Sequence, residues 1–150
     1  MARAKNALRG HFIGVWDPVN PTKKPTAWLE LAHYIQTITD DTDEETDDTG
    51  FYDGDGTPEE TVTSVKGSYT FEGFYDPTDL AQKLLADMKF EIGDGRRVWH
   101  KVVSSDNTKQ WIQVANASEI VAGDGDATSF EAFKAKLSWI KLPEESAVTP

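Results

Sequence analysis

The sequence contains no cysteine, which excludes a disulfide framework and a zinc site built from thiolates. Basic residues are also scarce: 15 Lys and Arg face 26 Asp and Glu, and the formal net charge is −11. Proteins that grip nucleic acid need clustered basic residues at the phosphates, so the composition argues against such binding. No apolar run approaches the roughly 20 residues of a membrane-spanning helix. Since the basic start MARAKNALRGHF lacks the apolar stretch of a signal peptide, we expect synthesis in the cytoplasm.

The most unusual segment covers residues 40–60 and reads DDTDEETDDTGFYDGDGTPEE. It holds eleven of the chain's 26 acidic residues, namely Asp40, Asp41, Asp43, Glu44, Glu45, Asp47, Asp48, Asp53, Asp55, Glu59 and Glu60. Because it has almost nothing to bury, the segment cannot by itself offset the entropy cost of becoming ordered. We therefore predict a long acidic loop, disordered in the free chain, inserted between two strands of a single 150-residue domain.

The acidic segment does not match the metal sites that carboxylates commonly build. An EF-hand counted from Asp43 places Asp48 where the loop requires glycine, and its flanks read as strands, not helices. The three Gly-Asp-Gly turns lack the regular spacing of calcium β-helix repeats. Loose screening by cations stays open as an alternative. We expect no specific metal site.

The sequence also carries no pattern that calls for catalysis. Catalytic carboxylates need a preorganised setting, which a solvated loop does not supply. His11, His33 and His100 lack metal-ligand spacing; we expect His11 in or near an N-terminal arm, and the other two as surface or cross-strand residues. No serine lies in a nucleophile elbow, and no glycine-rich loop precedes a helix with a lysine. We therefore predict a protein that is not an enzyme and needs no cofactor.

Hydrophobic periodicity predicts a mainly β domain. Short apolar runs indicate strands at 12–16 and 27–39, with a helix as the alternative for part of the second. The clearest strand covers 65–75, where one predicted face is apolar and the other polar. A hairpin from residues 97–103 and 110–117 follows later in the chain. The remaining strands are expected at 119–121 and 130–141, where the last has a helix as its alternative.

One amphipathic helix interrupts this pattern. Asp76 is a suitable N-cap and Pro77 suits the first helical position. The apolar residues Leu80, Leu84 and Met88 recur every fourth position, which predicts about three turns with one apolar face. The sum is a β-sandwich or partial barrel flanked by one helix, with a basic arm over residues 1–11 and a polar tail over residues 143–150.

Five tryptophans come from five different predicted strands: Trp16, Trp28, Trp99, Trp111 and Trp139. A carbohydrate-binding platform would gather several of them on one surface. Spread over separate strands, they are more typical of core and interface packing. We therefore expect them to stabilise the fold.

Two blocks of the sequence resemble the major tail proteins of long noncontractile phage tails. The first is Tyr52-Asp53-Gly54-Asp55-Gly56 with the stretch TVTSVKGSYTFEGFYD at 61–76 and the short helix after it. The second runs from Arg96-Arg97-Val98-Trp99 to Phe130-Glu131-Ala132-Phe133. The resemblance covers most of the chain and rests on overall pattern, not on a short invariant motif.

The resemblance implies a tail tube protein, a fold similar to the tube proteins of type VI secretion systems. Members assemble as hexameric rings, and each protomer adds strands to a continuous inner β-barrel. The rings stack around a tape measure protein, the tube ends at tail terminator and distal tail proteins, and DNA passes through the bore without specific binding. The implied location is the virion, after synthesis in the host cytoplasm, with no role for a membrane.

In that family a long loop between two early strands reaches the neighbouring ring, as do the arms and tails. By this resemblance, the candidate stacking residues are Asp40, Asp41, Asp43, Glu44, Glu45, Asp47, Asp48, Phe51, Tyr52, Asp53, Asp55, Glu59 and Glu60. The candidate basic partners on the next ring are Arg3, Lys5, Arg9, Lys23, Lys24, Arg96 and Arg97. An acidic bore would also repel DNA phosphates within a Debye length of about 8 Å.

Two other readings stay open at this point. The chain could be a different virion β-domain, such as a head–tail connector or a decoration protein. It could also be a calcium-dependent extracellular adhesion or carbohydrate-binding domain, although the missing signal peptide counts against that class.

Overall fold

The computed structural model describes residue 5, residues 9–50, residue 56 and residues 58–147, with only the backbone described for 47–50 and 58–61. Its elements in chain order are β1 (Gly10–Val15), β2 (Leu29–Glu30), β3 (Ile35–Asp40), β4 (Asp43–Gly50), β5 (Pro58–Lys66), β6 (Ser68–Phe74), α1 (Leu80–Ala86), the 3₁₀ helix η3 (Gly93–Arg96), β7 (Arg97–Val103), β8 (Lys109–Ala122), β9 (Ala132–Trp139) and β10 (Glu144–Ala147).

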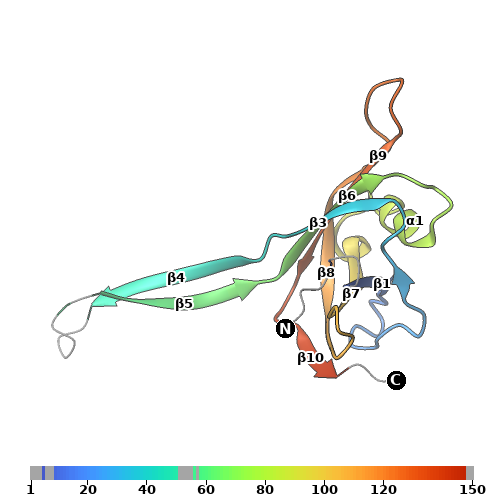
Figure 1. Cartoon of the computed structure of the whole chain (residues 1–150). Coiled ribbons are helices and arrows are strands. Elements are labelled where there is room, and N and C mark those ends of the chain that lie inside the picture. Colours follow the sequence, from blue (N-terminus) through green and yellow to red (C-terminus); the bar gives the residue numbers. More distant parts are fainter. Residues whose placement is uncertain (1–4, 6–8, 51–55, 57, 148–150) are drawn as a thin grey trace.

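Most of the chain forms one strongly curved antiparallel sheet (Figure 1). Within the described residues its strand order is β2-β1-β7-β8-β9-β6-β3, and β10 pairs with β8 off this path. The helix α1 packs against β8 and β2. Strands β4 and β5 pair only with each other and extend far from this body (Figure 1). The predicted fold class, mainly β with one flanking helix, is confirmed.

The core lies between the curved sheet and α1. Strand β9 shows the predicted alternation, in which every second side chain is buried. The buried core cluster consists of Ile13, Leu31, Phe71, Ala81, Leu85, Val98, Val102, Ala115, Ala117, Ile120, Phe133, Ala135, Leu137 and Trp139. A second cluster holds Trp16, Trp99, Ile112 and Val114, with Trp28 against it. Trp111 packs against the main core, so the tryptophans pack as expected.

Strand β6 departs from the predicted division into an apolar and a polar face. Ser68 and Thr70 lie on the predicted polar face but are buried. The hydroxyl of Ser68 lies 3.3 Å from that of Ser138, and the hydroxyl of Thr70 donates to Asp41. Val65, predicted on the apolar face, belongs to β5 and is 41% exposed. Polar partners on neighbouring segments therefore allow burial that the alternation alone does not predict.

The predicted strand over residues 27–39 is wrong as a single element. It divides into β2 and β3 because residues 31–34 leave the sheet and close a turn in which Tyr34 adopts a φ of 60°. The N–H of Ile35 closes this turn onto the carbonyl of Ala32 at 3.0 Å. His33 consequently lies in the turn, not in a strand as predicted.

The helix is shorter than predicted and begins later. Asp76 does not cap it; its carboxylate accepts from the backbone N–H of Thr78 at 2.9 Å and from the Thr78 hydroxyl at 2.6 Å. These hydrogen bonds lower the pKa of Asp76. The N-cap is Asp79, whose Oδ2 accepts from the N–H of Gln82 at 3.3 Å.

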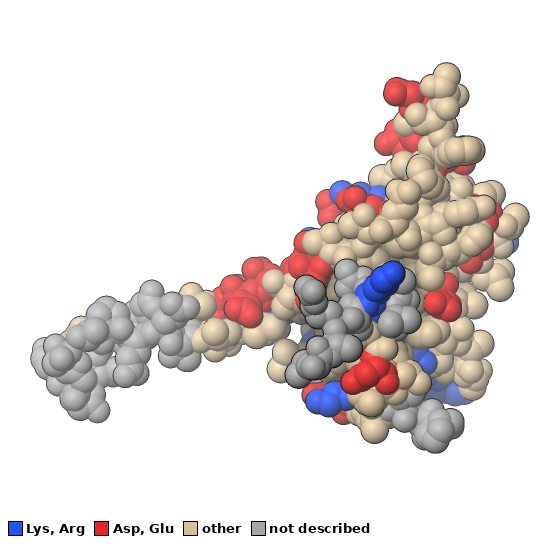
Figure 2. Space-filling model, in the orientation of Figure 1, with Lys and Arg blue, Asp and Glu red and all other residues tan. Residues whose placement is uncertain are grey.

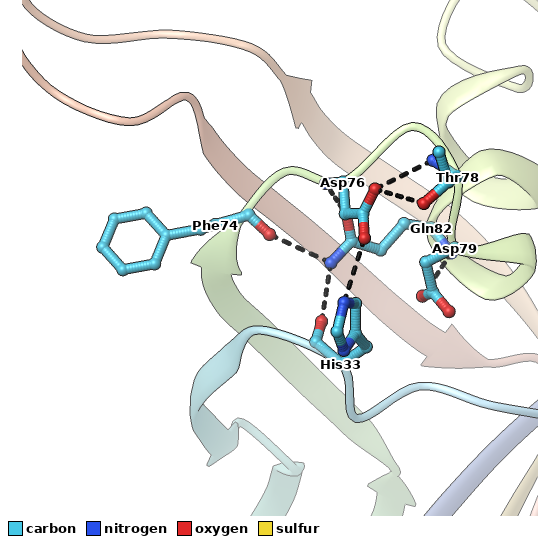
Figure 3. Close-up of polar contacts among 6 residues, drawn as sticks. All are labelled: His33, Phe74, Asp76, Thr78, Asp79 and Gln82. Carbon is cyan, nitrogen blue, oxygen red and sulfur yellow. Dashed lines mark hydrogen bonds and ion pairs between the residues drawn. The ribbon is translucent and has the colours of Figure 1, made fainter.

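Gln82 explains this start of the helix, because its fully buried side chain ties α1 to two other segments (Figure 3). Its Oε1 accepts from the N–H of Asp76 at 2.6 Å. Its Nε2 donates to the carbonyls of His33 at 2.9 Å and Phe74 at 3.0 Å. The side-chain amide of Gln82 thus binds three backbone groups: one in the turn before β3, one at the last residue of β6, and one just after β6. His33 also pairs with the Asp76 carboxylate at 2.9 Å.

The predicted hairpin of residues 97–103 and 110–117 is confirmed by the pairing of β7 with β8. The separate strand predicted at 119–121 is wrong, because β8 continues through it to Ala122. Glu119 has a φ of 50°, and the register with β9 shifts between Ser118 and Val121. A β-bulge therefore bends one long strand where the sequence suggests a break.

The histidines His11 and His100 are both buried. His11 lies in β1 at the end of the predicted arm, and His100 is a cross-strand residue of β7, as one of its two predicted positions had it, but it is not on the surface. Trp139 Nε1 donates to Nδ1 of His100 at 2.9 Å. Since that nitrogen accepts, Nε2 of neutral His100 carries the proton and donates to Nδ1 of His11, 3.3 Å away. Burial, together with the charge of Arg9, lowers the pKa of His11 to about 4. Burial also holds the pKa of His100 well below its usual value.

Both chain ends are more structured than predicted where they are described. The predicted arm overlaps β1, which begins at Gly10; residues 1–4 and 6–8 lie outside the described residues. The predicted polar tail contains β10, which pairs antiparallel with the first half of β8. Ion pairs hold it there: Lys24 to Glu144 at 2.9 Å and Lys109 to Glu145 at 3.3 Å.

Candidate functional site

The acidic segment is largely a β-hairpin, which corrects the prediction of a loop without regular structure. Strands β4 and β5 pair antiparallel from Asp43 opposite Lys66 to Gly50 opposite Pro58. They continue the pairing of β3 with β6, where Asp40 lies opposite Tyr69. The result is a long two-stranded ribbon that leaves the edge of the main sheet (Figure 1). The sequence does not indicate this hairpin, because its two strands show no alternation of apolar and polar residues.

The hairpin has little to hold it together on its own. Asp43, Glu44 and Glu45 are exposed, and Val62 on β5 is 50% exposed. The register of the two strands is irregular between Glu45 and Thr46, which interrupts the pairing. An isolated two-stranded hairpin is marginal in water even with a better sequence.

The root of the hairpin is tightly fixed. Gly67 separates β5 from β6, and its carbonyl accepts from the N–H of Trp139 at 2.8 Å. A Cβ at Gly67 would lie 2.2 Å from the Trp139 ring, so only glycine fits. On the other strand the N–H of Asp41 donates to the Ser68 carbonyl at 2.8 Å, and its carboxylate accepts from Thr70. These contacts set the direction in which the hairpin leaves the sheet.

The predicted stacking residues fall into four groups. Asp40 and Asp41 lie at the root, where the carboxylate of Asp40 accepts from the Thr42 N–H at 3.0 Å. Exposed carboxylates gather along the hairpin next to the body (Figure 2). Asp47, Asp48, Glu59 and Glu60 have a described backbone in β4 and β5. The last group, Phe51, Tyr52, Asp53 and Asp55, lies outside the described residues.

Several predicted basic partners already have contacts inside the subunit. The Arg96 guanidinium donates to the carbonyls of Glu91 at 2.7 Å, Ala117 at 3.2 Å, and Lys89. The other contacts are Arg97 over the Trp16 ring at 5.2 Å, Arg9 over the Trp111 ring at 5.9 Å, and Lys24 with Glu144. Lys5 and Lys23 are exposed, and Arg3 lies outside the described residues.

An apolar hollow that the sequence did not predict lies where β3 begins and β6 ends. We call it the aromatic hollow; its volume is about 580 Å³, and it is lined by Tyr34, Ile35, Gln36, Phe74, Tyr75, Phe130 and Glu131. These residues are far apart in the sequence and meet only because β6 lies between β3 and β9. No local pattern in the sequence indicates it.

Two other kinds of site are absent from the described part of the chain. There, no three His, Asp or Glu side chains converge to hold a metal ion. Across the same residues, no helix has both the length and the apolar character needed to cross a membrane.

The fold is similar to those of proteins from phage-like tails and tubes. No protein-family model matches the chain, and no curated protein matches it. A chain in the tail of an empty gene transfer agent particle, refined with helical C6 symmetry, aligns with a TM-score of 0.66 at 13% identity, over 97% of this chain and 100% of that one. A chain of the virion of a native gene transfer agent gives 0.59 at 12% identity, over 93% and 95%.

Contractile systems supply further similar structures. The tube-terminating cap of the anti-feeding prophage aligns with a TM-score of 0.58 at 9% identity, over 99% of this chain and 93% of that one. A chain of the sheath–tube complex of an extracellular contractile injection system gives 0.53 at 11% identity, over 92% and 88%. The chain therefore has the fold of tail tube proteins, and at these identities the likeness establishes the fold alone.

Proposed function

We propose that this chain is a structural subunit of a phage tail tube, which stacks as hexameric rings and forms the conduit for DNA. The observation that carries the proposal is the end-to-end match with a chain from a gene transfer agent tail of C6 symmetry, at 97% and 100% coverage. A match over the whole of both chains leaves no large domain unaccounted for in either.

The sheet edges support assembly into rings. In the described part of the chain, β2 pairs only with β1, and β3 pairs only with β6, so each has one edge without a partner strand. Such edges invite pairing with other chains. Closing six curved sheets into one barrel removes these edges, which is how β-barrel assemblies avoid uncontrolled aggregation.

The hairpin supports stacking of the rings. It extends from the body, lacks a core of its own, and carries exposed carboxylates that are free to pair with cationic groups of another copy (Figures 1 and 2). Contact between this hairpin and a different surface of the next copy is heterologous, and a heterologous contact that does not close generates a filament. Exposed basic residues of the adjacent ring, such as Lys5 and Lys23, are its proposed partners.

The remaining partners follow from the same proposal. The tube surrounds a tape measure protein and ends at tail terminator and distal tail proteins. DNA passes through the bore without specific binding, since a subunit of net charge −11 repels phosphate at short range. The subunit is made in the host cytoplasm and belongs to the virion. The long noncontractile tail type rests on the sequence resemblance, because similar folds also occur in contractile injection systems.

Imaging tests the proposal. Purified or co-expressed protein is measured by light scattering for its mass and by negative-stain electron microscopy for its shape. The proposal expects stacked rings of constant diameter. Single rings that never elongate would instead favour a connector or a tube-terminating cap, the second candidate function suggested by the similarity to such a cap. Binding only to preformed capsids would favour a decoration protein, and a melting temperature raised by millimolar calcium would favour an adhesion domain.

A further inference from the structure

The loop between β8 and β9 contains an Asp-Gly step in which the two residues contact each other directly. Residues 123–130 are all exposed, and the loop stands out beyond the end of the sheet (Figure 1). The backbone N–H of Gly125 donates to Oδ1 of Asp124, the residue just before it, at 2.7 Å. The side chain of Asp124 therefore folds back over the peptide bond that follows it.

This contact places a backbone nitrogen beside an acyl carbon. The carboxyl carbon of Asp124 carries the oxygen that the Gly125 N–H contacts. If the nitrogen attacks that carbon, a five-membered ring closes. Reactions between groups held in place need the reacting atoms about 3–3.5 Å apart, and a contact at 2.7 Å to the attached oxygen supplies that proximity.

The surroundings of Gly125 leave room for such a ring. Its φ is 121°, in the region that favours glycine, and a Cβ at this position would have the carbonyl oxygen of Phe130 as its nearest neighbour, 4.0 Å away. Among the described residues, no cation pairs with the Asp124 carboxylate, and no backbone carbonyl accepts the Gly125 N–H. Within that part of the chain, the two groups are thus held by each other alone.

A second Asp-Gly step, Asp94-Gly95 in η3, is equally exposed but arranged in the opposite way. The Gly95 N–H donates to the carbonyl of Ile92 at 3.2 Å. The Asp94 carboxylate faces the guanidinium of Arg97 at 3.9 Å. Nitrogen and carboxyl are each directed at another partner, so this step lacks the reactive contact. The two other Asp-Gly steps of the sequence, at 53–54 and 55–56, include residues outside the described ones.

We propose that Asp124 is a site of spontaneous backbone rearrangement, in which the Gly125 nitrogen attacks the Asp124 side-chain carboxyl and a succinimide forms. The new bond joins the Gly125 nitrogen to Cγ of Asp124. The bond from Cγ to its hydroxyl breaks, and the hydroxyl leaves with the amide proton as water. A second water molecule then opens the ring at either carbonyl, which restores aspartate or gives isoaspartate. The rearrangement needs only water and is independent of the proposed tube function.

Isoaspartate at this position changes the end of the β8–β9 hairpin. It routes the main chain through the former side chain and so adds one carbon atom to the backbone. The Asp124 carbonyl, which accepts from the Ala132 N–H at 3.0 Å, becomes a free carboxylate. Phe130 and Glu131, which line the aromatic hollow, belong to the same loop. The rearrangement therefore alters the loop and one wall of the hollow while the mass of the chain stays the same.

Peptide mapping of stored protein tests the inference, because trypsin places the two described steps in separate peptides, residues 110–134 and residues 90–96. Folded protein is kept for weeks at mildly acidic pH and sampled. The peptide 110–134 should gain a species lighter by one water and an isomer of unchanged mass, which electron-transfer fragmentation locates at Asp124. Conversion at Asp124 should be at least about tenfold faster than at Asp94, a modest share of what proximity and orientation contribute.

Unfolding provides a matched control within the same chain. In guanidinium both steps lose their fixed neighbours, so their rates should become similar. The variant D124E keeps a carboxylate at an exposed position, but its longer side chain cannot close the five-membered ring, so both new species should disappear from peptide 110–134. Equal rates at Asp124 and Asp94 in the folded protein overturn the inference. So does the same ratio of rates in folded and unfolded protein, or no conversion at Asp124 while the unfolded chain converts.

Discussion

At the residue scale, the buried chain Trp139–His100–His11 links three strands of the sheet through side-chain nitrogens. The order of donation works only with both imidazoles neutral, because a proton added to Nδ1 of His11 would face the N–H of His100. The rings of Tyr69 and Phe71 pack edge to face against His11, and the side chain is largely buried, so an added charge would be poorly solvated. Protonation of His11 at low pH should therefore destabilise this part of the core.

The first prediction concerns stability in mild acid. The folded pKa of His11, about 4, lies below the ordinary value of 6.5, so between these values the unfolded chain binds more protons. Stability is full above about pH 6.5 and falls as the pH drops toward 4. For His11 alone the loss between pH 7 and pH 5 is about 2 kcal/mol. Urea unfolding followed at several pH values measures it.

The variant H11F provides the comparison for that experiment. It removes the titrating ring and keeps an aromatic side chain at the buried position on β1. We expect a smaller loss of stability between pH 7 and pH 5 than in the wild type, relative to each protein's own value at pH 7. A wild-type unfolding free energy that stays constant over this range would contradict the prediction.

At the element scale, the hairpin β4–β5 depends on how its root is packed. Its two strands leave the sheet beside Trp139, and Gly67 allows the backbone to lie against the indole ring. Any side chain at this position has to displace either the strand or the buried tryptophan. The direction of the hairpin is thus coupled to the core of the domain.

The substitution G67A tests this coupling. Its methyl group would lie 2.2 Å from the Trp139 ring, and overpacking of this kind costs about 1–3 kcal/mol. We expect a lower urea midpoint and altered Trp fluorescence. The control S64A changes an exposed position of the same ribbon and should leave both unchanged. Equal midpoints for G67A and the wild type would show that the root is not tightly packed.

The elements that could be predicted from the sequence are those whose side chains alternate in burial. Strand β9 is the best example, because its buried residues recur at every second position. The break at Tyr34 could not be predicted, since it depends on contact with Gly73, a distant glycine on β6. The start of α1 likewise depends on backbone groups that reach Gln82 from other segments.

The candidate sites show the same division between local and distant information. The acidic segment is visible in the sequence as composition, but its pairing as a hairpin is not, because β4 and β5 carry no apolar face. The aromatic hollow is invisible in the sequence, because Tyr34, Phe74 and Phe130 meet only through the order of strands in the sheet.

At the scale of the whole molecule, the hairpin extends away from the body, which predicts two levels of protection of backbone N–H groups from hydrogen exchange (Figure 1). Hydrogen exchange should be slow in β7, β8 and β9, which form the centre of the sheet. It should be fast in β4 and β5 of the free subunit, which have no core beneath them. In assembled tubes the exchange of residues 43–66 should slow strongly. Equal exchange of this hairpin in both states would mean that no neighbour covers it.

Charge neutralisation tests how the rings attract one another. Replacing half of the acidic segment with Asn and Gln, beginning with D43N, E44Q and E45Q, should weaken assembly and reduce its dependence on salt. The reason is that the proposed ion pairs between rings would be lost, and exposed pairs of this kind are screened by salt. Sedimentation at a series of salt concentrations measures both effects.

A control for that experiment neutralises carboxylates outside the hairpin. Glu30, Asp87 and Asp126 are exposed on the body, so E30Q, D87N and D126N change the net charge by the same amount as D43N, E44Q and E45Q. If assembly depends on hairpin charge, this control should retain the salt dependence of the wild type. The same response from both sets of variants would indicate an effect of net charge alone.

Cryo-electron microscopy of the assembled chain tests the central claim most directly, namely that this protein is a tube subunit whose acidic hairpin joins successive rings. The expected map shows stacked rings of six copies around an open bore, with residues 43–66 of each copy lying against a subunit of the next ring. Isolated rings, irregular aggregates, or a tube whose hairpins extend into solvent without touching the neighbouring ring would contradict the claim.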